Sequence, residues 1–378
     1  MMFTCAVPGC VDGADRHAPA KRPARGATRA ATRRSTKTVR DARGRRLRVD
    51  IHCHYLNADV AARVAPLNPA QYDPQVQFAN ALTREVNVKQ IRARGGKLSD
   101  VETRLKDMDR MSIDVQAVSP APNQTYYWTD PELGTELARA INDRLAEIVA
   151  TRPDRFVALG TAPLQHAERA VDELTRCVKQ LGLRGVEINP SVNGMDLTDP
   201  SLGLEKFFAR AQELDAVIFM HPIGFTHASR LLDHYFNNVI GNPLETTIAA
   251  SHLIFDGVLQ RNPRLKVILP HAGGYLAHYW ARMDHAWRAR PDSRTVIQRP
   301  PSTYLRKMYF DTIAFAAAML RQMVDQYGAD HILLGSDYPY DMGVDDPVGF
   351  VASVPRLGRD ARAAIEGGNA ARLLKIRR

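Results

Sequence analysis

The stretch LRVDIHCHY, residues 47–55, joins a continuous apolar run to two histidines that are separated by one residue. Such a run is typical of a strand buried on both faces, as in a parallel sheet. Because residues i and i+2 of a strand point to the same side, His52 and His54 are expected to face the same interior. Two imidazoles that converge in this way form half of a metal site. The alternative is a pair of polar residues at a strand end that hydrogen bonds keep inert.

Seven further apolar, β-branched runs each predict a buried strand. They cover residues 115–121, 156–163, 185–190, 216–222, 265–271, 308–314 and 331–339. Helical periodicity lies between them, as in residues 129–155, which begin with a Thr129 or Asp130 cap, and in residues 244–263. The alternation favours the α/β class and a closed (β/α)₈ TIM barrel. An open doubly wound sheet would alternate in the same way, but no glycine-rich dinucleotide loop or Walker sequence supports it.

Two segments fall outside this pattern. Residues 56–98, after the first strand, are expected to form an irregular insertion over the barrel mouth. Residues 1–46 hold 12 of the 51 Lys and Arg residues and 3 of the 41 Asp and Glu residues, so this tail carries most of the formal net charge of +10. With few large apolar residues, the tail is expected to be disordered. The predicted organisation is a disordered basic tail, residues 1–46, and one metal-dependent barrel, residues 47–378.

Composition also narrows the class of protein. No stretch approaches the roughly 18 consecutive apolar residues that a membrane-spanning helix needs, so no membrane partner is expected. The tail could serve as an organelle transit peptide, as a nucleic-acid arm, or as a dispensable start. A nucleic-acid-binding protein that uses this tail stays as a remote alternative. Cytoplasmic thiols are expected because no zinc-site or redox spacing relates the cysteines, which are Cys5, Cys10, Cys53 and Cys177.

Three more predicted strands end in a residue that can bind a metal or a proton. His221 ends the run 216–222, His271 ends the run 265–271, and Asp337 lies near the end of the run 331–339. Each histidine alone could be an ordinary core residue, whereas a buried carboxylate is costly unless it is paired or bound to a metal. In a (β/α)₈ barrel the active site forms at the carboxyl ends of the strands. The fold therefore predicts that these three side chains meet the two histidines of the first strand.

The type of ligand indicates the metal. Three imidazoles and one carboxylate, from His52, His54, His221 and Asp337, suit Zn²⁺, and Mn²⁺, Fe²⁺ or Co²⁺ are alternatives. Such a site leaves room for a water, whose pKa the ion would lower toward neutrality. His271 stays outside this ligand set and is the candidate base that activates the water.

The chain resembles the α-amino-β-carboxymuconate-ε-semialdehyde decarboxylase branch of the amidohydrolase-related family, from about residue 48 to about residue 374. The motifs that carry the resemblance are DIHCH, MDRMSIDVQAVS, NDRLAEIVATRPDRFVALGTAPLQ, GNPLETTIAAS, PRLKVILPHAGG and DHILLGSDYPYDMG. The resemblance implies the same four metal ligands and gives His271 the role of activating the water. It also implies that Arg92 binds a substrate carboxylate, and that Arg282 reaches the active site of the neighbouring subunit in a homodimer. A guanidinium suits such bidentate binding, although either arginine could be an ordinary surface charge.

The sequence departs from the family pattern at two places. Asn238 stands where the family has an aromatic pocket residue, and no tryptophan follows His221 and Pro222, so the pocket is expected to be smaller or more polar. The fourth predicted strand, GVEINP, has no lysine to bridge two ions. This argues against the binuclear hydrolases of the superfamily, although Glu187 leaves that alternative open.

The sequence thus predicts a metal-dependent, non-oxidative decarboxylase of an unsaturated or aromatic carboxylic acid. The alternative within enzymes is a hydrolase or hydratase that uses the same activated water. Decarboxylation removes CO₂ from the substrate, whereas hydrolysis and hydration add water.

Overall fold

The computed structural model describes residues 46–376, and its centre is a ring of eight parallel strands. These strands are β1 (Val49–Tyr55), β2 (Val115–Pro120), β3 (Phe156–Ala158), β4 (Gly185–Ile188), β7 (Val217–Met220), β8 (Lys266–Leu269), β9 (Tyr309–Asp311) and β10 (Ile332–Leu333). A small antiparallel hairpin, β5 (Ser191–Val192) and β6 (Met195–Asp196), follows β4. Each of the eight predicted runs contains one of the eight parallel strands.

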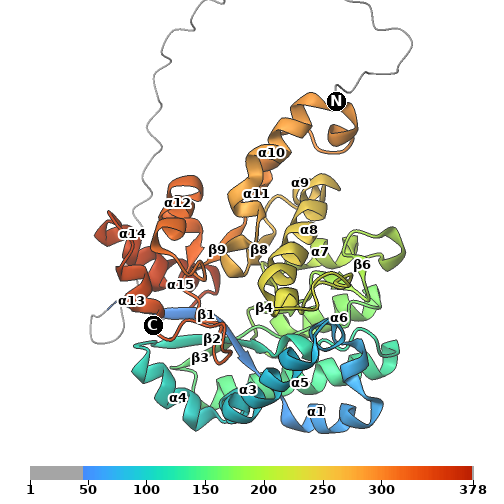
Figure 1. Ribbon diagram of the computed structural model, residues 1–378, viewed down its shortest axis with the longest axis vertical. Coiled ribbons are helices and arrows are strands. Elements are labelled where there is room, and N and C mark those ends of the chain that lie inside the picture. The colour runs from blue at the N-terminus through green and yellow to red at the C-terminus, as the bar shows by residue number, and fades with distance from the viewer. Residues whose placement is uncertain (1–45, 377–378) are drawn as a thin grey trace, which may run out of the picture. The chain divides into compact units, whose positions relative to one another are not determined.

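Backbone hydrogen bonds join the sheet segments into a closed barrel. Between β3 and β4, Gly160 N donates to Gly185 O at 2.9 Å, and Glu187 N donates to Gly160 O at 2.7 Å. At the other seam, Asp337 N donates to His52 O at 2.8 Å and so joins the segment after β10 to β1. In Figure 1 the blue strand β1 runs beside the red C-terminal part of the chain. The predicted TIM barrel is therefore confirmed.

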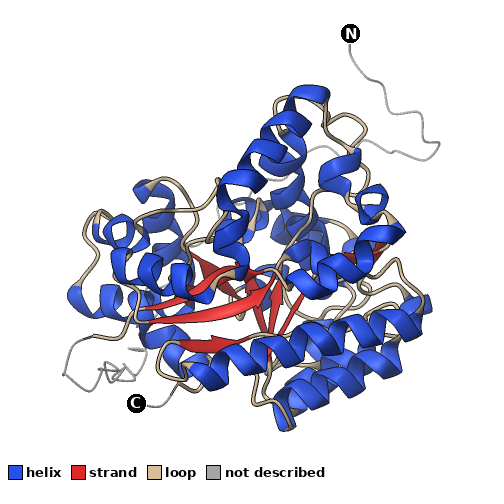
Figure 2. Cartoon of the chain, turned by 90° about the horizontal axis from the view of Figure 1, so that it is seen from below, coloured by secondary structure: helices blue, strands red, loops and turns tan. Residues whose placement is uncertain are grey.

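Helices surround the strands, which lie in the interior in Figure 2. The helices are α1 (Ala58–Val64), α2 (Pro74–Gln77), α3 (Ala81–Ser99), α4 (Val101–Arg110), α5 (Pro131–Thr151), α6 (Ala167–Lys179), α7 (Glu205–Glu213), α8 (Asn242–Phe255), α9 (Val258–Arg261), α10 (Leu276–Ala289), α11 (Pro301–Leu305), α12 (Ala317–Tyr327), α13 (Pro347–Ala352), α14 (Arg359–Ala363) and α15 (Asn369–Leu373). Asp130 caps α5 by accepting a hydrogen bond from Leu133 N, as its sequence predicts. The single helix predicted over 244–263 is wrong, because Gly257 at φ +78° separates α8 from α9.

The described residues also form shorter helical turns. Those of 3₁₀ type are η1 (Ala65–Leu67), η2 (Pro69–Tyr72), η3 (Pro122–Gln124), η4 (Pro200–Leu202), η6 (His271–Gly273), η7 (Pro291–Arg294) and η8 (Ala329–His331), and those of π type are η5 (Asn237–Gly241) and η9 (Ala364–Gly368).

Alternation along the strands separates the barrel interior from the layer under the helices. In β7, Val217 and Phe219 belong to one buried cluster, while Ile218 and Met220 belong to another. The ring of Phe219 lies 4.9 Å from that of His52, centroid to centroid, so the first cluster fills the barrel interior below the histidines. A layer of buried apolar side chains thus fills the barrel interior beneath the polar side chains at the rim.

The insertion after β1 is helical, so the prediction of an irregular segment over residues 56–98 is wrong. Its longest helix is α3, whose apolar residues Leu82 and Ile91 are 67% and 66% exposed. Because these residues form no stripe that packs on the barrel, apolar periodicity does not reveal the helix. The insertion does cover the barrel mouth, since Asn237, in the loop after β7, donates from Nδ2 to Pro74 O at 2.7 Å.

The predicted disordered tail, residues 1–46, lies outside the described residues except for Arg46. The domain boundary at residue 47 therefore stays a prediction. Within residues 46–376, no helix combines the length and the apolar character that crossing a membrane requires.

Substitution of Gly185 tests how tightly β4 and β7 pack in the closed barrel. The φ of Gly185 is +152°, and an added Cβ would lie 1.9 Å from Val217 O. Gly185→Ala is therefore expected to lower the free energy of unfolding by about 2 kcal/mol or more, because overpacking typically costs about 1–3 kcal/mol. Gly96→Ala is the matched control, since an added Cβ in α3 would meet nothing within 4 Å. Urea unfolding measures both, and equal midpoints for the two variants would contradict the expectation.

Candidate metal centre

Strand β1 presents His52 and His54 with one ring nitrogen each free for a ligand. His52 Nδ1 lies 2.7 Å from Asp311 Oδ2, and His54 Nδ1 lies 3.0 Å from Pro120 O. Because both of these partners are acceptors, each Nδ1 carries a proton, and Nε2 is the atom that can bind a ligand when the ring is neutral. The two Nε2 atoms lie 3.1 Å apart. The strand therefore offers two converging donors to one point.

The structure brings the other three predicted side chains to the same point. Asp337 Oδ1 lies 3.2 Å from the Nε2 atoms of both His52 and His54, and Asp337 Oδ2 lies 3.7 Å from His271 Nε2. The ring of His221 lies 4.7 Å from that of His54 and 5.0 Å from that of His271, centroid to centroid. Within the described residues, His52, His221, His271 and Asp337 offer ligand atoms that all lie within 4.8 Å of one another.

The donor set fits a divalent cation. Both ring nitrogens of His221, Nδ1 of His271 and Oδ1 of Asp337 are buried and lack a hydrogen-bond partner. Polar atoms that are buried without a partner are costly, and native structures contain few of them. A cation at this point would give one ring nitrogen of His221 and Oδ1 of Asp337 a partner. The cluster is therefore a candidate metal centre, with His54 or His271 able to complete the ligand set.

The pKa values of the clustered side chains are shifted in directions that favour a bound cation. Burial, followed by the charges of His54 and His52, holds the pKa of His221 well below its usual value, so this imidazole stays neutral. Burial raises the pKa of Asp337, but His52 and His271 outweigh burial and hold it well below the usual value. Burial lowers the pKa of His52, whereas Asp337 and Asp311 raise it to about 10. Without an ion, His52 thus carries a proton that a bound cation would displace.

Three buried carboxylates at the barrel interior escaped the sequence prediction as site residues. Asp311 accepts the hydrogen bond of His52, and Asp50 accepts hydrogen bonds from Ser336 Oγ at 2.6 Å and from Gln116 Nε2 at 3.0 Å. Glu187, noted only as a possible second-metal ligand, is 1% exposed, and its Oε2 lies 3.6 Å from His54 Nδ1. Burial raises the pKa of Glu187 to about 7. The sequence feature that could have identified these three residues is an acidic residue inside an apolar strand, because such a charge is costly to bury without a partner.

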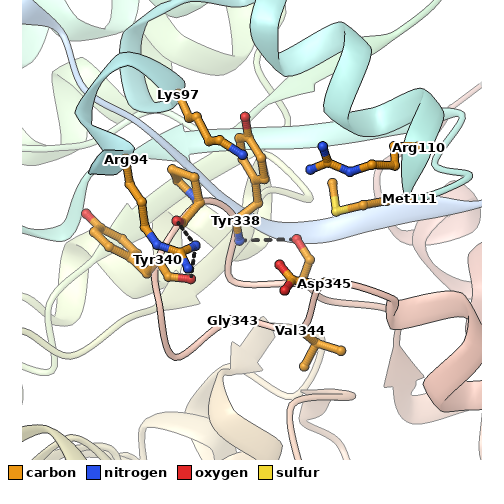
Figure 3. Close-up of a pocket in the computed structure, with 11 residues that line it drawn as sticks. Arg94, Lys97, Arg110, Met111, Tyr338, Tyr340, Gly343, Val344 and Asp345 are labelled. Atoms are coloured by element: carbon orange, nitrogen blue, oxygen red, sulfur yellow. Dashed lines mark hydrogen bonds between the residues drawn. The ribbon is translucent and has the colours of Figure 1, made fainter. Parts of the chain in front are cut away.

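The two predicted substrate arginines lie away from the cluster within this chain. Arg92 on α3 and Arg282 on α10 are both exposed, and neither makes a described hydrogen bond or ion pair with the five clustered side chains. Arg94, two residues after Arg92, instead reaches the loop after β10, where it donates to Pro339 O at 3.1 Å (Figure 3). The substrate-binding roles of Arg92 and Arg282 stay predictions.

The contact of Arg94 with Pro339 lies in a small pocket that is lined by several cations. Lys97 and Arg110 both pair with Asp107, each at 2.9 Å, and Asp107 Oδ2 also accepts a hydrogen bond from Tyr338 OH at 2.9 Å. Figure 3 shows these cations gathered around Tyr338, the residue that follows Asp337. The insertion and α4 therefore hold the loop that carries Asp337.

Two cavities lie at the rim of the barrel. One, of about 270 Å³, has His271 and Asp337 in its wall and is otherwise largely apolar, with Asn238 also in the wall. The other, of about 730 Å³, lies between the insertion and the loops after β2 and β4. In its wall the rings of Tyr72 and Trp128 stack at 4.2 Å. The smaller cavity borders the cluster directly and is the candidate substrate pocket.

A closed (β/α)₈ barrel with a His/Asp cluster at the carboxyl ends of its strands defines a metal-dependent barrel enzyme. The sequence model described as Amidohydrolase matches residues 49–376, and the chain belongs to this family. The chain is 34% identical over 278 residues to a 2-amino-3-carboxymuconate-6-semialdehyde decarboxylase of Dictyostelium discoideum. That match covers 73% of this chain and 77% of the relative, and it confirms the predicted decarboxylase branch.

Solved structures agree with this assignment. The structure of 5-carboxyvanillate decarboxylase LigW from Sphingomonas paucimobilis is 27% identical, with a TM-score of 0.78, and the match covers 88% of this chain and 99% of that one. A dihydroxybenzoic acid decarboxylase from Polaromonas sp. JS666, solved with manganese and the inhibitor 2-nitroresorcinol, is 26% identical, with a TM-score of 0.71 and coverage of 88% and 98%. The chain is thus a metal-dependent carboxy-lyase, as its sequence predicts.

The separate roles of His54 and His271 can be measured from bound metal. If His54 is a ligand and His271 is the base, His54→Ala is expected to weaken metal affinity by more than about 100-fold, the upper end of what loss of a supporting group costs. His271→Ala is expected to keep the metal and lose turnover. Metal content after dialysis and a chelator competition measure both variants. If His271→Ala loses the ion while His54→Ala keeps it, the roles are reversed.

Proposed function

We propose that this enzyme removes CO₂, without oxidation, from an unsaturated or aromatic carboxylic acid held beside one divalent ion. The observation that carries the proposal is the convergence of the cluster with a largely apolar cavity, which share His271 and Asp337. A cavity of about 270 Å³ suits a single ring or a short unsaturated chain, since small-molecule pockets begin at about 300 Å³. The ligands in this proposal are His52, His54, His221 and Asp337.

The donor set favours Zn²⁺ as the ion. Three neutral imidazoles and one carboxylate match the usual zinc ligands, and Mn²⁺, Fe²⁺ and Co²⁺ are accepted by sites of similar composition. The bound manganese in the dihydroxybenzoic acid decarboxylase makes Mn²⁺ the first alternative for this chain. When bound, the ion supplies a positive charge that stabilises negative charge developing on the oxygens of the substrate.

His271 handles the proton in this proposal. Its side chain is 16% exposed, lies in the cavity wall, and has an Nδ1 atom without a hydrogen-bond partner. The imidazole can therefore take a proton and return it to the substrate carbon that bears the carboxylate. As that carbon gains the proton, its bond to the carboxylate breaks and CO₂ leaves. The electron pair of the broken bond restores the unsaturated system, so the step balances without an oxidant.

Binding of the substrate carboxylates is assigned to the two arginines of the resemblance. Arg92 lies on the insertion that covers the mouth, and Arg282 lies on α10, which begins at the wall of the cavity near Tyr275. An exposed Arg282 suits a role in the neighbouring active site, so the proposal includes a homodimer. The buried free thiols of Cys53 and Cys177 fit a reducing compartment, and we place the enzyme in the cytoplasm.

Decarboxylation is tested with metal-loaded protein and a panel of unsaturated and aromatic acids. Zn²⁺-loaded enzyme, with Mn²⁺ in a parallel arm, is expected to release CO₂ and leave a product lighter by that mass. His271→Ala is expected to lower kcat by about 10²–10⁴-fold, the usual contribution of a general acid or base. His285→Ala, which removes an exposed histidine on α10, is the control and is expected to keep kcat. A product heavier by one water would instead identify a hydratase or hydrolase.

The role of Arg282 across subunits is tested by mixing two inactive variants. His271→Ala removes the base of its own site, while Arg282→Ala removes an arginine from the partner's site. In a mixed dimer one site then keeps both groups, so activity is expected to return when the subunits are mixed and exchanged. Activity and oligomeric state are measured before and after exchange. Absence of recovery in a confirmed mixed dimer would remove Arg282 from the neighbouring site.

A further inference from the structure

The geometry points to Asp311 as a positioning residue that holds His52 and the backbone of His271 in one fixed arrangement. Asp311 ends β9, is fully buried, and faces the cluster from the side opposite the ion position on His52. The inference rests on the proposed function, because it assumes that His52 binds the ion and that His271 moves the proton. It extends that function by adding a carboxylate that contacts neither ion nor substrate.

Four donors surround the two carboxylate oxygens of Asp311. Oδ2 accepts hydrogen bonds from His52 Nδ1 at 2.7 Å and from His271 N at 2.9 Å. Oδ1 accepts hydrogen bonds from Ala272 N at 2.7 Å and from Ile313 N at 3.1 Å. A carboxylate has about four lone-pair sites, so these contacts use its accepting capacity. Asp311 therefore acts through its neighbours and is not itself a metal ligand.

The contact with His52 selects the tautomer of that imidazole. An ionised carboxylate only accepts hydrogen bonds, so Asp311 places the ring proton on Nδ1 and leaves the lone pair of Nε2 toward the cluster. An asparagine at this position would put NH₂ in the place of one oxygen, and so against two of the four N–H donors. If it faced His52, the ring would have to accept at Nδ1 and protonate Nε2, the atom that faces Asp337 at 3.2 Å.

The contacts with the backbone hold the turn that carries His271. His271 and Ala272 adopt φ values of 51° and 55°, in the left-handed region that side chains disfavour. The N–H groups of both residues donate to Asp311, which stabilises this strained turn. Loss of these two hydrogen bonds would release the turn and shift the imidazole relative to Asp337. One carboxylate thus fixes a proposed ligand and the proposed base together.

The absence of a side chain at Gly335 allows His52 and Asp311 to lie in contact. Gly335 lies in the segment after β10, and an added Cβ would lie 3.0 Å from the Cβ of His52 and 3.1 Å from the Cβ of Asp311. Both distances are tighter than ordinary contacts. A methyl group at this position would therefore separate His52 and Asp311 while both functional groups stay present. Gly335→Ala is a second, independent way to disturb the same contact.

Asp311→Asn is the first test. It is expected to weaken affinity for Zn²⁺ by about 10–100-fold, the usual effect of removing a partner that orients a metal-binding histidine. At saturating Zn²⁺, the pH profile of kcat is expected to shift, because the turn of His271 is released. Nitrogen NMR of labelled histidines is expected to show that His52 loses its Nδ1 proton. Asp311→Glu, which keeps the charge, is expected to restore part of the affinity.

Glu173→Gln is the matched control for loss of a buried carboxylate. Glu173 is 1% exposed and accepts hydrogen bonds from Asn142, at 2.8 Å, and from Arg176, at 2.9 Å, on the helical side of the barrel. The control is expected to lower the unfolding midpoint and to leave Zn²⁺ affinity and the pH profile unchanged.

Two results would overturn the proposal. In the first, Asp311→Asn binds Zn²⁺ as tightly as the native chain and keeps its pH profile, whatever its stability. In the second, which decides the question if Asp311→Asn does not fold, Gly335→Ala keeps native Zn²⁺ affinity. Affinity and the NMR signal of His52 do not depend on turnover. If no acid is decarboxylated, these two readouts still decide the role of Asp311 separately from the proposed reaction.

Discussion

The hydrogen bond from Asp337 N to His52 O, 2.8 Å long, closes the barrel at the point where the metal centre is assembled. Because all eight strands are parallel, closure places the ends of β1 and β10 side by side at one rim. Asp50 reinforces this seam by accepting hydrogen bonds from Ser336 N at 3.1 Å and from Ser336 Oγ at 2.6 Å. The same contacts therefore complete the fold and bring the carboxylate to the imidazoles.

The buried carboxylates at this seam favour a nearby positive charge. Asp311 and Asp337 are ionised carboxylates that burial alone would neutralise, and His52 supplies the positive charge that stabilises them in the absence of an ion. His221 stays neutral and has no partner for either nitrogen. Buried charges are tolerated when they are paired or bound to metal. A divalent ion held here would add positive charge beside both carboxylates and would give one nitrogen of His221 a partner.

The sequence was sufficient for the barrel and for the five clustered side chains because both signals are local. A buried apolar run marks a strand, a polar residue at its end marks the rim, and parallel topology then brings His221 to His52 without long-range information. The helix α3 was not predictable in this way, because Leu82 and Ile91 are exposed and give no packed stripe. Asp311 lies inside a strand that was predicted, but its four donors come from three different segments, so only the folded chain shows what it holds.

Different segments at the rim supply the clustered polar side chains and the wall of the neighbouring cavity. His271, Asp311 and Asp337 follow or end β8, β9 and β10. Asp311 accepts hydrogen bonds from His52 Nδ1 and from His271 N, and the carboxylate of Asp337 lies 3.2 Å from His52 Nε2 and 3.7 Å from His271 Nε2. The loop after β7 instead contributes Asn238 to the cavity, where the family resemblance implies an aromatic residue. Apolar surface in the same cavity comes from the segment after β9, through Phe315 among others. Because Asn238 and Phe315 lie outside the hydrogen-bonded seam, the cavity can differ in shape and polarity while the His/Asp cluster keeps its geometry.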